Sequence, residues 1–176
     1  MATQFCFEHQ FRAPSIDAVF AAYFDPTHLL HQDKMLDIAL REVLELRDEG
    51  RVLRRSCKVV PRRQLPAIVR PFLKGPLHYI ETATWRRDDS EIDIQIWPSL
   101  LKHKPEPTIT ALYRLTRRAD GSIHRSYKGT VSVDLALIAS RIERGIVAEF
   151  ERSIPLAAAA TQDFLDRSGR YVAAHA

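Results

Sequence analysis

Three charged residues, Glu42, Arg55 and Glu81, fall on otherwise apolar faces of predicted β-strands. Because successive side chains of a strand point to opposite faces, these charges are predicted to point toward the interior. An isolated charge is costly to bury, so a buried Arg55 needs carboxylates, a ligand or water beside it. The pattern has two interpretations, a structural ion cluster and a polar anchor for a ligand head group. A bulge that shifts the alternation would instead place the charges outside.

Other chemical motifs are weak. The sequence has no Gly-x-Ser-x-Gly, no phosphate-binding glycine loop and no dinucleotide fingerprint. His28 and His31 lie three residues apart, near Asp33, but a metal site usually needs three or four ligands. No metal site or cofactor is therefore predicted. Nothing matches a nucleic-acid-binding motif, and no nucleic acid partner is expected.

Period-two alternation predicts that these charges are carried by short strands. Phe5 to Phe11 alternates and forms a first strand, and helix starts follow at Ser15 and at Asp25-Pro26. Acid- and glycine-containing turns then predict three hairpins. Their strands are Ile38 to Arg47, Val52 to Val60, Leu77 to Arg86, Glu91 to Trp97, Thr108 to Thr116 and Ser122 to Val133.

The last apolar stretch, Leu135 to Leu165, has apolar residues every three or four positions, which predicts one long amphipathic helix. Pro155 is expected to kink it. Strands followed by such a helix favour an α+β fold in which the helix lies on a curved, seven-stranded antiparallel sheet. A hollow between the two layers, lined by apolar side chains, would bind apolar molecules.

Strand parity and the helical stripe together predict which side chains line this hollow. In addition to the three charged residues, they are Trp85, Ile92, Ile94, Ile96, Ile109, Tyr113, Tyr127, Ile142, Ile146 and Phe150.

The 176 residues fit one domain, predicted over 1–167, with a disordered tail at 168–176. No stretch of about 18 apolar residues is present, so no bilayer-spanning segment is predicted. The first residues lack a basic head followed by an apolar run, so no secretory signal is predicted and a cytoplasmic location is expected.

The net charge of +4 is unevenly distributed, because residues 51–80 contain eight Lys or Arg and no Asp or Glu. Within this region, residues 61–76 join two strands and mix apolar with cationic side chains. The segment is predicted to be either a lid over the protein's own core or a rim that meets an anionic membrane surface. The membrane-facing candidates are Arg62, Arg63, Ile68, Arg70, Phe72 and Lys74.

The order of one strand, two short helices, six strands and a long helix resembles the helix-grip fold of the START-like (SRPBCC) superfamily. This superfamily includes birch-pollen-allergen-like proteins, lipid-transfer START domains and polyketide cyclases. The segments 65–85 and 129–165, the latter with Arg141 and Glu143 near the helix start, resemble a bacterial START-like family without an assigned activity. The resemblance implies a fold and a cavity, but fold alone does not fix function.

Three functions are compatible with this resemblance. The first is a carrier or sensor that binds a lipid or another hydrophobic small molecule. The second is an enzyme of the cyclase or dehydratase kind, for which Glu42, Glu81, Tyr113 and Tyr127 are the acid–base candidates. The third is a protein-interaction module that uses only the scaffold.

Overall fold

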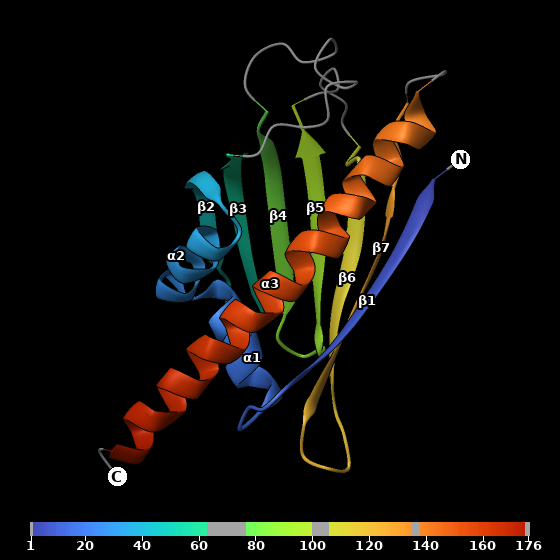
Figure 1. Cartoon of the computed structure of the whole chain (residues 1–176). Helices are drawn as coiled ribbons and strands as arrows, with labels where there is room; N and C mark the ends of the chain where they lie inside the picture. The colour runs from blue at the N-terminus through green and yellow to red at the C-terminus, as the bar shows by residue number, and fades with distance from the viewer. Residues whose placement is uncertain (1, 63–76, 100–105, 135–137, 175–176) are drawn as a thin grey trace.

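The computed structural model describes residues 2–62, 77–99, 106–134 and 138–174 (Figure 1). The elements are β1 (Thr3–Phe11), α1 (Ile16–Phe24), α2 (Pro26–Met35), β2 (Ile38–Asp48), β3 (Val52–Pro61), β4 (Tyr79–Arg86), β5 (Glu91–Pro98), β6 (Ile109–Arg117), β7 (Ile123–Val131) and α3 (Ala139–Ala174). The strands form one antiparallel sheet in the order β1-β7-β6-β5-β4-β3-β2. The predicted fold class, with its seven strands and long C-terminal helix, is confirmed.

Both short helices begin at the residues predicted to cap them. The Ser15 side chain accepts a hydrogen bond from the amide of Ala18 at 3.1 Å. Asp25 Oδ1 accepts from the amides of Thr27 and His28 at 2.7 and 3.0 Å, with Pro26 as the first helical residue. These caps satisfy amide groups that have no partner within a helix, so the chain turns twice before it enters β2.

Helix α3 runs diagonally across the same face of the sheet that α1 and α2 cover (Figure 1). Its start is fixed by the buried Glu143, whose Oε1 accepts from the amide of Val133 at 2.9 Å and whose Oε2 accepts from Thr3 Oγ1 at 2.7 Å. One carboxylate thereby joins the helix to β1 and to the chain that follows β7. Pro155 lies inside the helix, as predicted.

The helix extends further than predicted. Its backbone is helical to Ala174, past the domain boundary predicted at residue 167. The disorder expected for residues 168–176 stays a prediction. The segment contains no proline, and Gly169 alone does not end a helix because an isolated glycine costs only about 1 kcal/mol. The predicted helix start at Leu135 lies outside the described residues, and the helix is described from Ala139.

The edge strand β2 departs from regular alternation. Its pairing with β3 shifts register between Ile38 and Leu40, and again between Val43 and Glu45. An extra residue in one strand reverses which side chains face inward beyond it. Arg41 consequently lines the interior, whereas Glu42 is exposed. The prediction that Glu42 points inward is therefore wrong.

Candidate functional site

A cavity of about 430 Å³ lies between α3 and the sheet, with contributions from α1, α2 and β2. Its wall is mainly apolar. Pro61, Leu77 and Pro98 line one end, close to the ends of β3, β4 and β5. Tyr23 lines it from α1, and Thr161 lines it from α3.

Eight of the predicted residues line this cavity. Strands β4 to β7 contribute most of them, and α3 contributes two from its apolar stripe. They are Glu81, Ile94, Ile96, Ile109, Tyr113, Tyr127, Ile146 and Phe150.

The predicted residues Trp85, Ile92 and Ile142 are buried in the solid core, and none of them lines the cavity. Helix α1 fills the space before Trp85. The ring of Phe20 lies 5.0 Å from the Trp85 ring, and the ring of Phe24 lies 6.0 Å from it. The sequence predicted that all three side chains face inward, but not that α1 would occupy the space before Trp85.

Most of the predicted membrane-facing rim lies outside the described residues, namely Arg63, Ile68, Arg70, Phe72 and Lys74. Arg62 is described and exposed, and it forms an ion pair of 3.4 Å with Asp37. The membrane contact therefore stays a prediction.

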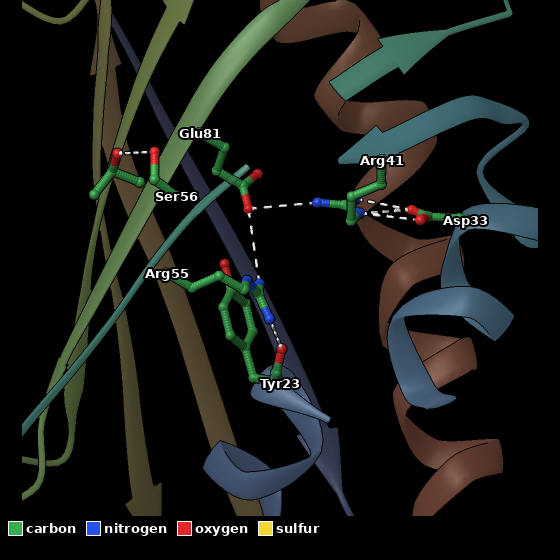
Figure 2. Close-up of polar contacts among 7 residues, drawn as sticks. Tyr23, Asp33, Arg41, Arg55, Ser56 and Glu81 are labelled. Atoms are coloured by element: carbon green, nitrogen blue, oxygen red, sulfur yellow. Dashed lines mark hydrogen bonds and ion pairs between the residues drawn. The ribbon is translucent and has the colours of Figure 1, made fainter. Parts of the chain in front are cut away.

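A network of charges from β2, β3 and β4 includes two cavity-lining residues, Arg41 and Glu81. Figure 2 shows its contacts. Glu81 Oε1 lies 3.7 Å from Arg41 Nη1 and 4.0 Å from Arg55 Nη2. Arg41 also donates from Nε to both oxygens of Asp33 at 2.9 and 3.0 Å. The side chains of Arg55, Arg41 and Glu81 are only 3%, 8% and 17% exposed.

Arg55 does not line the cavity itself. It donates from Nη1 to the backbone carbonyl of Tyr23 at 2.8 Å, and its guanidinium lies over the rings of Tyr23 and Phe24. The ion cluster foreseen as one interpretation of the buried charges is thus present, with Arg41 in the position predicted for Glu42. It joins β2, β3 and β4 to α1 and α2.

The electrostatics of the cavity oppose ionisation of its tyrosines. Burial, followed by the charge of Glu81, raises the pKa of Tyr79 and of Tyr127 well above the ordinary value. Burial also raises the pKa of Tyr113. These hydroxyls remain protonated at neutral pH, so they can form hydrogen bonds with a ligand but are poor bases.

Arg41 stays charged within this network. Burial alone would lower the pKa of Arg41, but the Glu81 carboxylate and the hydrogen bonds to Asp33 outweigh burial and raise it. Arg41 was missed from the sequence because the bulge in β2 leaves no signal in the apolar alternation. Tyr79 and Arg125 fell on predicted inner faces but were not singled out.

The histidines do not form a metal site within the described ranges, which contain no cluster of three or more potential ligands. His28 Nε2 lies 3.1 Å from Thr161 Oγ1, and His31 Nε2 lies 2.9 Å from Asp163. Both histidines therefore pack α2 against α3, whereas Asp33 is engaged by Arg41.

A seven-stranded antiparallel sheet, two short helices after the first strand and a long C-terminal helix define the START-like, birch-pollen-allergen-like helix-grip fold. Solved structures support this assignment. A START superfamily protein from Mycobacterium smegmatis is similar over 93% of this chain and 97% of its own, with 10% identity and a TM-score of 0.59. Ara h 8.0201 is similar over 94% and 98%, with 14% identity and a TM-score of 0.60. The ZhuI aromatase/cyclase from Streptomyces sp. R1128 is similar over 95% of both chains, with 11% identity and a TM-score of 0.61.

The chain belongs to the family described as "Protein of unknown function (DUF2505)", which matches residues 7–165. No curated protein matches the sequence. At these low identities the similar structures establish the fold alone. Within the described part of the chain, no helix has the length and apolar character needed to cross a bilayer.

Proposed function

We propose that this protein binds a hydrophobic small molecule or lipid in the cavity between α3 and the sheet, as a carrier or sensor. The observation that carries the proposal is the cavity itself. Its volume of about 430 Å³ falls within the range of small-molecule sites, and its apolar wall includes a few polar groups. The similarity to a START superfamily protein supports the same conclusion, because that superfamily includes lipid-transfer domains.

The contacts of Glu81 favour binding over catalysis. A general acid or base must exchange a proton with its substrate, but the Glu81 carboxylate lies between two buried guanidinium groups. Exposed Glu42 cannot act inside the cavity. The raised pKa values of Tyr113 and Tyr127 also oppose a role as bases. Among the acid–base candidates from the sequence, Glu81 thus has a structural role, Glu42 lies outside the cavity and the two tyrosines are poor bases.

A fluorescence titration with parinaric acid, a naturally fluorescent fatty acid, tests the proposal. Ala157 lines the cavity, whereas Ala159 is exposed on the same helix. We expect saturable binding by the wild type, at least tenfold weaker binding by Ala157→Leu and unchanged binding by Ala159→Leu. Folding of each variant is checked by circular dichroism.

A second variant, Ile94→Glu, places a charge on the cavity wall and is expected to abolish binding. Wild-type affinity in folded Ala157→Leu and Ile94→Glu would show that the probe does not bind in this cavity.

A further inference from the structure

Arg125 is a buried cation that lines the cavity and is only 4% exposed. Along β6 and β7 the register pairs Ile109 with Val131 and Leu115 with Arg125. Because Ile96 pairs with Ile109, Arg125 lies at the end of the cavity away from Ile96. The charge of Arg125 therefore lies inside the cavity, remote from the ends of β3 and β5 at Pro61 and Pro98.

The other cations of the cavity wall have carboxylate partners. Arg41 pairs with Asp33 and Glu81, and Arg152 pairs with Glu149 on the same helix. Within the described residues, no carboxylate lies at ion-pair distance from Arg125. Its Nε also has no hydrogen-bond partner there.

The neighbours of Arg125 are neutral. Its Nη2 donates to His9 Nδ1 at 2.6 Å, and its guanidinium lies 5.4 Å from the ring centroids of both Phe11 and Tyr113. Burial, assisted by the adjacent Arg125, lowers the pKa of His9 to about 4, so His9 is neutral at pH 7. Cation–π contacts, the neutral His9 and a side-chain hydrogen bond with the neutral Tyr113 hold the guanidinium in place but leave its charge uncompensated.

We propose, on the basis of the proposed function, that the natural ligand is an apolar molecule with a single carboxylate that binds to Arg125. An arginine presents several N–H donors in a plane and suits a carboxylate better than a neutral polar group. One uncompensated cation fits one anionic group. The apolar part of the ligand then extends from Arg125 past Ile109 and Phe150 toward Ile96.

The test compares parinaric acid with its methyl ester, which has the same chain but no charge. Wild-type protein is expected to bind the acid at least tenfold more tightly than the ester. In Arg125→Met, which keeps an apolar stem against Phe11 and Tyr113, the acid is expected to lose this advantage and the ester to bind as before. Arg114→Met, at an exposed cation that lies outside the cavity and pairs with Glu91, is the matched control and should keep the preference.

The outcomes separate the two claims. Binding of neither probe by wild-type protein would overturn the proposed function, and this inference with it. Equal binding of acid and ester by wild-type protein would overturn the carboxylate inference alone, without any need for a folded variant. A preference for the acid that survives in folded Arg125→Met, or that is lost equally in Arg114→Met, would also overturn the role of Arg125.

Discussion

At the scale of single residues, two buried arginines converge on the carboxylate of Glu81. Arg41 comes from the edge strand and Arg55 from its neighbour, so the carboxylate holds together strands and helices distant in sequence. Removing its charge would leave two cations with less compensation in a poorly hydrated region. The loss of a partner for a buried charge is costly even where the original pair contributes little net stability.

Glu81→Gln is therefore expected to lower the free energy of unfolding by about 1–3 kcal/mol, measured by urea denaturation at neutral pH. Glu91→Gln is the matched control, because Glu91 pairs with the exposed Arg114 on the outer face, and its expected effect is below about 1 kcal/mol. Equal, small effects of both changes would show that the network contributes no stability. If Glu81→Gln instead abolished a cyclase or dehydratase activity of the wild type without lowering its stability, the enzyme hypothesis would be favoured.

His28 is expected to make stability depend on pH. It is only 1% exposed, and burial lowers its pKa to about 4, although the charge of Asp25 acts in the opposite direction. Between about pH 6.5 and 4 the unfolded chain binds a proton that folded His28 does not, so stability falls as the pH falls. The slope of stability against pH that His28 adds is at most about 1.4 kcal/mol per pH unit. This slope falls to zero above and below the window. Denaturation of wild type and His28→Gln across the window should give a shallower slope for the variant; identical slopes would exclude His28 as a source.

At the scale of elements, the regular strands were predictable and the irregular one was not. Strands β4 to β7 pair without register shifts, so apolar alternation correctly placed Ile94, Ile109 and Tyr127 on the inner face. Strand β2 has two register shifts, and its exposed apolar side chains Leu40 and Leu44 suggested the wrong face. Bulges depend on pairing with a neighbouring strand, and so the alternation of one strand cannot reveal them.

Gly129 lies in β7 where this strand, β1 and β6 approach one another closely, and a substitution can test this close approach. A Cβ at this position would meet the carbonyl oxygen of Thr110, lie 2.6 Å from Phe5 Cζ and lie 2.8 Å from Ala111 Cβ. Because a backbone atom is among these neighbours, Gly129→Ala is expected to destabilise the protein by about 1–3 kcal/mol, measured by chemical denaturation.

The control for this prediction is Gly145→Ala in α3, where a Cβ would meet nothing within 4 Å. This change is expected to stabilise the protein by up to about 1 kcal/mol, because alanine favours a helix interior. If Gly129→Ala were as well tolerated as Gly145→Ala, the close approach of β1, β6 and β7 at this point would be contradicted.

At the scale of the whole molecule, the order of elements was sufficient to predict a sheet, a helix across it and a hollow between them. The extent of the hollow was not predictable, because it depends on how α1 packs against the sheet. Phe20 fills the space before Trp85, whereas the region around Ile94 and Phe150 remains open. The sequence thus identified the two layers, but only packing divides their interface into core and cavity.

Native mass spectrometry tests the occupancy of this cavity most directly. Protein purified without detergent is measured before and after incubation with parinaric acid, alongside Ala157→Leu and Ala159→Leu. We predict one bound molecule per 20.2 kDa chain in the wild type and in Ala159→Leu, and a strong loss in Ala157→Leu. Detection of the bare chain alone in every wild-type sample, or equal occupancy in both variants, would contradict a ligand cavity between α3 and the sheet.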